Sequence, residues 1–266
     1  MSATPSHISM PRLVAAIATN SFREAIRDRI LYNLVLFVLL LVACAILLGD
    51  LTNGQEARTI ANIGLNAMLL FGAFIAVFVG VGLVSKEIER RTVHIIFSKP
   101  VGRGHFIVGK YLGLCATLFV NVVIMGVGIS MALLYVGSAD MALTVWPAIY
   151  LIFLELALVT AVATLFSTFS TPALSALFTF FVFLIGHLSS SLNDLGQTMG
   201  SSFARIVLST IYYILPNLSL FSFRTEAANA LTPGIEMLAT SSAYATIYAA
   251  ILLSAATVIF SRRDFK

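Results

Sequence analysis

Long uninterrupted runs of apolar residues constrain the fold of this chain more than any other feature. A helix needs roughly 20 apolar residues to cross the hydrocarbon core of a bilayer, and the chain has six segments of about that length. Only 11% of its 266 residues are charged, against about 25% in soluble domains. We therefore predict an all-α polytopic membrane protein with a single domain over residues 1–266. The predicted spans are residues 31–48, 63–84, 111–136, 146–169, 173–192 and 243–260.

The distribution of Lys and Arg predicts the direction of these spans. Of the 16 such residues, 13 lie in the N-terminal segment, in residues 85–110 or after the last span, and three lie in the segments between. Cytoplasmic loops of membrane proteins carry an excess of Lys and Arg. We therefore expect both termini and residues 85–110 to lie in the cytoplasm. The net charge of +4 reflects this topology, so we expect no nucleic-acid partner.

Residues 193–242 are expected to form an outer region before the last span. Ile206–Phe223 is apolar enough to suggest a seventh span, but Pro216 and Asn217 interrupt it. A seventh span would also place the basic C-terminus outside, against the distribution of charge. We expect one or two short re-entrant helices that dip into the outer leaflet and return. The acidic residues of this region belong either to a solvated loop or to an extracellular gate.

Glu155 is the one ionisable residue well inside a predicted span. It lies about ten residues from the start of the fourth span, hence roughly 15 Å deep. A carboxylate at that depth is costly and often functional. Glu155 therefore either lines a polar part of a transport path or a dimer contact, or it is a protonated or hydrogen-bonded structural residue that faces Asn66, Asn121 or a hydroxyl. His187, near the outer end of the fifth span, is expected to be a satisfied interfacial residue rather than a metal ligand.

No motif in the chain predicts chemistry or nucleotide binding. The segment from Gly104 to Tyr111 nearly matches the phosphate-binding loop G-x-x-x-x-G-K-[ST], but Tyr111 cannot supply the small hydroxyl that holds Mg²⁺. That loop also follows a strand in an α/β domain, whereas here a membrane helix begins. The common hydrolase and metalloprotease motifs are missing as well. We therefore predict no catalytic residue, no metal site and no cofactor in this chain.

Residues 85–110, which we call the basic loop, separate the second and third spans. Residues 85–98 can continue the second span as a helix, Pro100 and Gly102 favour a turn, and a second helix can start near His105. The first helix would carry an apolar face of Ile88, Thr92, Ile95 and Ile96. Such a loop either binds lipid headgroups or docks a soluble partner.

The basic loop also carries an ordered series of short motifs. In chain order these are an acidic pair, a threonine, an apolar run, Ser-x-Pro, an arginine and Gly-Lys. This order resembles the cytoplasmic loop of ABC-2 type permeases, the membrane subunits of a class of ATP-driven exporters. Arg91 stands where many members have glycine. The outline of the whole chain is similar to that family too, and looks most similar to its copper-enzyme maturation permease subgroup.

The resemblance implies partners for this chain. In that family a separate ATPase binds ATP and Mg²⁺, two permease chains pair, and two ATPase chains dock on the cytoplasmic loops. The helix around Glu87–Phe97 would then be the coupling helix that transmits nucleotide-driven closure to the spans. The residues implied in docking and coupling are Glu87, Glu89, Arg90, Arg91, Thr92, Ser98, Pro100, Arg103 and Lys110.

The resemblance also implies a cytoplasmic interfacial helix over residues 10–30. Its residues Phe22, Ile26 and Ile30 form one apolar stripe, while Leu13 and Ile17 project to the opposite side. A single straight amphipathic helix is therefore not expected to account for the whole segment.

The expected function is that of a permease subunit in a bacterial-type cytoplasmic (inner) membrane. A homodimer of six-helix bundles would export a substrate by alternating access, powered by the partner ATPase. Two other classes stay open from the residues alone. One is a secondary transporter or channel that uses Glu155 as a proton or ion relay, and the other is a membrane scaffold that transports nothing. The substrate could be a lipid, a drug, a peptide or a small sulfur or metal species.

Overall fold

The computed structural model describes residues 10–27, 54–89, 103–189 and 214–262, with residues 210 and 212 and a few positions between 34 and 43. All regular structure in these residues is helical. The helices are α1 (Met10–Arg27), α3 (Glu56–Glu89), α5 (Arg103–Tyr135), α6 (Ala139–Thr144), α7 (Trp146–Ser167), α8 (Pro172–His187), the short 3₁₀ helix η1 (Leu218–Phe221), α11 (Arg224–Ala227) and α12 (Ile235–Arg262).

Four helical stretches in the described part of the chain are long and apolar enough to cross a membrane. They are the apolar parts of α3, α5 and α12, and residues 139–167 of α6 and α7 together. Helix α8 is apolar but shorter, at 16 residues. The predicted span 31–48 falls mostly outside the described residues, so the count of six spans stays a prediction.

Helices α3 and α5 extend well beyond the spans predicted for them. They have 34 and 33 residues, and at about 1.5 Å per residue each is roughly 50 Å long. The hydrocarbon core is only about 30 Å thick, so both helices project past it. Residues 139–144, expected to be loop, form α6 because Ala, Met and Leu favour helix there. Gly137, with φ of +83°, makes the turn that ends α5.

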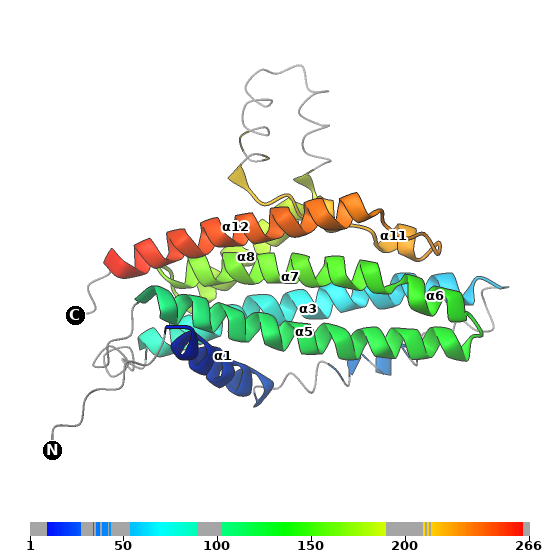
Figure 1. The fold of residues 1–266 in the computed structure, drawn as a ribbon, viewed down its shortest axis with the longest axis horizontal. Helices are drawn as coiled ribbons and strands as arrows, with labels where there is room; N and C mark the ends of the chain where they lie inside the picture. Colours follow the sequence, from blue (N-terminus) through cyan, green and yellow to red (C-terminus); the bar gives the residue numbers. More distant parts are fainter. Residues whose placement is uncertain are drawn as a thin grey trace.

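The long helices pack around α7 (Figure 1). Helices α3 and α12 run in the same direction as α7, and α5 and α8 run in the opposite direction. Helix α7 is apolar on every side and contacts α3, α5, α8 and α12, as expected for a helix at the centre of a bundle. The end of α3, the start of α5, the start of α8 and the end of α12 gather at one end of the bundle (Figure 1). The predicted topology places these same helix ends on one side of the membrane.

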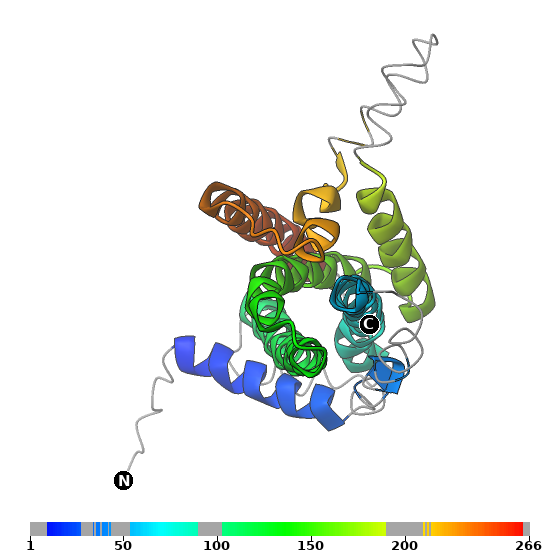
Figure 2. The ribbon, with the colours of Figure 1, turned by 90° about the vertical axis from the view of Figure 1, so that its right-hand side faces the viewer.

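Helix α1 is one continuous helix that lies across the bundle rather than along it (Figure 2). It packs on the first turns of α5. Its buried or half-buried residues are Leu13, Val14, Ile17, Ala18, Ser21 and Phe22. These positions cover about half the circumference of a helix, so Ile17 and Phe22 both contact protein from a single helix. Ile26 and Ile30 of the other expected stripe lie outside the described side chains, so the expectation for the whole segment 10–30 stays a prediction.

The described part of the outer region forms a short irregular segment, residues 216–231, which we call the cap segment. It contains η1 and α11 and packs on the end of the bundle opposite α1, against α3, α7 and α8 (Figure 1). Its residues Leu218, Phe221 and Ala227 are buried. Helix α12 begins at Ile235, earlier than the predicted start at residue 243, because Glu, Met, Leu and Ala in its first turns favour helix. Residues 193–209 lie outside the described residues, so re-entry stays a prediction.

Candidate functional site

Four of the predicted docking residues lie on the described helices, at the bundle end that also holds α1 (Figure 1). Glu87 and Glu89 belong to the last turn of α3, and Arg103 is the first residue of α5. The side chains of these three residues are outside the described part of the structure, as are the predicted docking residues Arg90, Arg91, Thr92, Ser98 and Pro100. Their role in docking stays a prediction.

Lys110 is the one predicted docking residue whose side chain the structure describes. Only 3% of it is exposed, and its Nζ lies 3.6 Å from a carboxylate oxygen of Glu24 on α1. The same Nζ lies 5.7 Å from the ring centroid of Phe106, within reach of a cation–π contact. In this conformation Lys110 points into the protein and binds α1, so it offers no surface to a partner.

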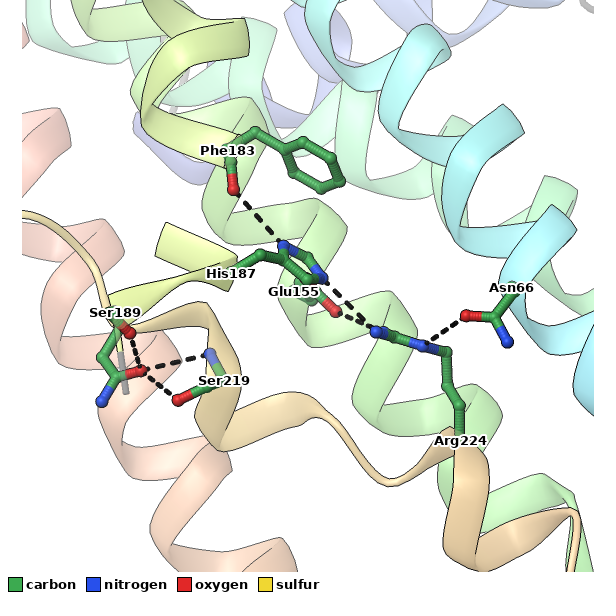
Figure 3. Close-up of polar contacts among 8 residues, drawn as sticks. Asn66, Glu155, Phe183, His187, Ser189, Ser219 and Arg224 are labelled. Atoms are coloured by element: carbon green, nitrogen blue, oxygen red, sulfur yellow. Dashed lines mark hydrogen bonds and ion pairs between the residues drawn. The ribbon is translucent and has the colours of Figure 1, made fainter. Parts of the chain in front are cut away.

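Glu155 belongs to a polar cluster, which we define as Asn66, Glu155, His187 and Arg224 (Figure 3). Arg224 contacts the other three members. The Glu155 side chain is completely buried. Arg224 Nη1 lies 3.5 Å from Glu155 Oε2, and His187 Nε2 lies 3.1 Å from Glu155 Oε1. Arg224 Nε donates to Asn66 Oδ1 at 3.1 Å, and Arg224 Nη2 lies 3.5 Å from His187 Nε2. The four residues come from α3, α7, α8 and α11.

Local contacts orient each partner of Arg224. The Asn66 amide nitrogen donates to the Asn62 side chain and backbone on the same helix, at 2.6 and 2.8 Å. This fixes the amide so that its oxygen faces Arg224. His187 Nδ1 lies 3.3 Å from the backbone oxygen of Phe183, one turn earlier on α8. A buried charge needs such satisfied partners.

A second anchor holds the start of the cap segment. Asn217 Oδ1 accepts from Ser189 Oγ and Ser219 Oγ, each at 2.6 Å, and from Ser219 N at 3.1 Å. The backbone N–H of Asn217 donates to the hydroxyl of Tyr244 on α12 at 2.9 Å. The cap segment is therefore attached by Asn217 near its start and by Arg224 in its middle.

The structure identifies partners of Glu155 that the sequence does not predict. Asn66, one of the expected neighbours, is in the cluster but reaches Glu155 only through Arg224, and Asn121 instead bonds to Thr117 on its own helix. Arg224 is counted in the sequence only as an outer charge, and His187 only as an interfacial residue. One signal does exist: a buried acidic group needs polar or charged partners, and Arg224 is one of two arginines in the region that precedes the last span.

The cluster is built to hold side chains together rather than to perform chemistry. It contains one acid and one guanidinium, and no group of three potential metal ligands occurs among the described residues. An apolar groove of about 530 Å³ lies elsewhere, between α3 and α8, lined by residues such as Phe74, Phe78, Leu177 and Phe180. Such a groove offers dispersion contacts but no polar group to react with a ligand.

Comparison with known families gives a match over almost the whole chain. A family model described as ABC-2 family transporter protein matches residues 15–265, from within α1 to the C-terminus. No curated protein matches the chain. The match includes the basic loop, the polar cluster and the cap segment, so all of them belong to the same family domain.

Proposed function

The chain belongs to the ABC-2 transporter family, and from that premise we propose that it is the membrane half of an ATP-driven exporter. It is an integral membrane protein and the membrane subunit of an ABC-2 type transporter, a transport subunit rather than an enzyme. The family implies a separate ATPase as partner. No cofactor is expected in this chain, since ATP and Mg²⁺ would bind to that partner.

In the proposed assembly, two copies of the chain pair and two ATPase chains bind to them. Each copy has six spans, and both termini face the cytoplasm of a bacterial-type inner membrane. Within the family, we place the chain in the subgroup of the copper-enzyme maturation permeases. The grouping of helix ends supports this orientation. The end of α3, the start of α5 and the end of α12 share one end of the bundle with α1 (Figure 1), and 13 of the 16 Lys and Arg residues belong to the segments at these ends.

The observation that carries the proposal is the continuity of α3 and α5 with the basic loop. Helix α3 continues to Glu89 and α5 begins at Arg103, so residues 90–102 connect two rigid helices that are each roughly 50 Å long. Closure of an ATPase bound there would displace both helices along their whole length. We assign Glu87, Glu89, Arg90, Arg91, Thr92, Ser98, Pro100 and Arg103 to this docking and coupling surface. Lys110 is assigned to the contact with α1 instead.

Co-purification with the ATPase tests the proposal. The tagged chain is expressed with the ATPase encoded beside it, as wild type, as the double variant Glu87→Lys/Glu89→Lys, and as the control Glu236→Lys. Glu236 is exposed at the start of α12, at the opposite end of the bundle. The double variant is expected to lose the ATPase or the coupling of hydrolysis to transport, and the control to keep both. A double variant that keeps the complex and coupled transport would exclude this role for the loop.

For Glu155 we propose an anchoring role, supported by its complete burial between Arg224 and His187. The alternative is that it lines the transport path. The variant Glu155→Gln separates the two. Reduced stability with transport retained in the assembled protein agrees with anchoring, whereas unchanged stability with transport lost agrees with the path.

A further inference from the structure

The hydrogen bonds of His187 determine where its ring carries a proton. Nδ1 lies 3.3 Å from the backbone oxygen of Phe183, and a carbonyl oxygen can only accept, so Nδ1 is the donor. Nε2 lies 3.5 Å from Arg224 Nη2, and a guanidinium nitrogen can only donate, so Nε2 is the acceptor. These two contacts describe a neutral imidazole with its proton on Nδ1.

The same accounting leaves one oxygen of Glu155 without a donor. Oε2 accepts from Arg224 Nη1 at 3.5 Å. Oε1 is completely buried and has no hydrogen-bond donor among the described residues, yet it lies 3.1 Å from His187 Nε2. In the tautomer above, both atoms of that contact present lone pairs to each other. Buried polar atoms nearly always have a partner, so a hydrogen atom is required between them.

We propose that Glu155 and His187 bind one exchangeable proton, carried on Glu155 Oε1 and donated to His187 Nε2. The separation of 3.1 Å is within the range of a hydrogen bond between oxygen and nitrogen. The one lone pair of Nε2 then accepts from Oε1 at 3.1 Å, and the longer contact of 3.5 Å with Arg224 Nη2 shares that lone pair. A proton on Nε2 instead would place a second cation beside the guanidinium. The carboxyl is therefore the better carrier. Of the two residues only His187 has an accessible side chain, with 21% exposed against 0% for Glu155, so the proton exchanges on the His187 side of the pair.

Of the residues that the structure describes, the titratable or charged groups around Glu155 all belong to the polar cluster. Among the described residues, the charged or titratable groups in contact with Glu155 are His187 on α8 and Arg224 on α11. Helix α3 contributes the neutral amide of Asn66, which reaches Glu155 through Arg224. Helices α5 and α12 also pack on α7, and neither places an ion-pair partner on Glu155 in the described part of the chain.

Occupancy of the site changes how Arg224 is held. With the proton bound, Glu155 is neutral and Arg224 is held by neutral acceptors. When the proton leaves, Glu155 becomes a carboxylate and its bond to Arg224 becomes a charge-assisted bond between opposite charges, which is stronger. Because Arg224 is the first residue of α11, the proton determines how firmly the middle of the cap segment is attached to the bundle.

Infrared difference spectroscopy of the purified chain in lipid nanodiscs tests the proton directly. A protonated carboxyl has a C=O stretch separate from the bands of carboxylates. We expect this band in the wild type at neutral pH, its loss in Glu155→Gln and its persistence in the control Glu226→Gln, which removes an exposed carboxyl near Arg224 in the sequence. In His187→Leu the band should shift, because leucine supplies no acceptor in place of Nε2. A wild-type spectrum identical to that of Glu155→Gln, or a band unchanged in His187→Leu, overturns the proposal.

Nitrogen NMR of the chain with ¹⁵N-labelled histidine provides a second measurement if Glu155→Gln does not fold. His187→Gln assigns the signals among the four histidines. We expect His187 as a neutral ring protonated on Nδ1 and accepting a hydrogen bond at Nε2. A doubly protonated ring at neutral pH overturns the proposal. Both measurements use the permease chain alone, so their outcome is independent of ATPase docking and of transport.

Discussion

Gly113 on α5 is the position where one added methyl group tests the contact between α5 and α1. A Cβ atom built on Gly113 would lie 2.5 Å from the backbone oxygen of Ala18 and 2.7 Å from Ser21 Cβ. Ordinary van der Waals contact begins near 3.4 Å. Neither neighbouring atom is the far end of a flexible side chain, so Gly113→Ala would force α1 as a whole to move away from α5 by roughly 1 Å.

Two opposing terms determine the size of the effect. Overpacking of a tight contact costs about 1–3 kcal/mol, and replacement of a helical glycine by alanine returns about 0.5–1 kcal/mol. For Gly113→Ala the net loss of unfolding free energy is therefore about 1 kcal/mol, or a fall in Tm of about 2–4 °C. Gly128→Ala on the same helix is the matched control, because its Cβ would have no neighbour closer than 3.9 Å. The control keeps the stabilisation that alanine brings to a helix and has no steric clash.

Thermal unfolding of the purified variants and hydrogen exchange of the α1 amides measure this effect. Gly113→Ala is expected to unfold below the wild type and to lose protection in α1, while Gly128→Ala unfolds at or above the wild type with α1 protected. If the two variants show equal Tm values and equal protection of α1, then α1 does not depend on close contact at Gly113 and the packing argument is wrong.

Three further predictions concern the cap segment. Arg224→Gln is expected to lower the unfolding free energy by about 1–3 kcal/mol, because it leaves buried acceptors without their donor. In a double-mutant cycle, the free energies lost in Arg224→Gln and in Glu155→Gln should sum to more than the loss in the double variant. Strictly additive losses would contradict the contact between Arg224 and Glu155. Gly186→Ala is expected to lower the Tm of the chain relative to Gly128→Ala, because its Cβ would lie 2.8 Å from the backbone oxygen of Pro216; an unchanged Tm would contradict close packing there. The third measures hydrogen exchange of the Ala228 amide, which donates to the Arg224 backbone oxygen at 3.0 Å. As the pH rises and Glu155 loses its proton, this exchange should slow, once the measured rates are corrected for the intrinsic pH dependence of amide exchange. The same pH response in Glu155→Gln would contradict the link to that proton.

The helices themselves could be predicted from the sequence because helix formation and membrane burial depend on neighbouring residues. A run of apolar residues satisfies its own backbone hydrogen bonds as a helix, and its length decides whether it can cross a bilayer. For this reason the apolar runs of α3, α5, α7 and α12 are visible in the sequence. The starts of two of these helices were not predicted, since α3 begins at Glu56 and α12 at Ile235, before the apolar runs at residues 63 and 243.

The contacts between helices were decided only by the tertiary structure. Glu155 and Arg224 are 69 residues apart, and Asn66 and Arg224 are 158 apart, so no local spacing relates them. Lys110 shows the same limit: its motif suggests a surface residue, but the approach of α1 to Gly109 and Gly113 buries it. Hydropathy and charge along the chain determined which segments are helical and which helix ends lie together. The partner of each buried polar group depended on packing between helices distant in sequence, because only that packing brings a donor to an acceptor removed from water.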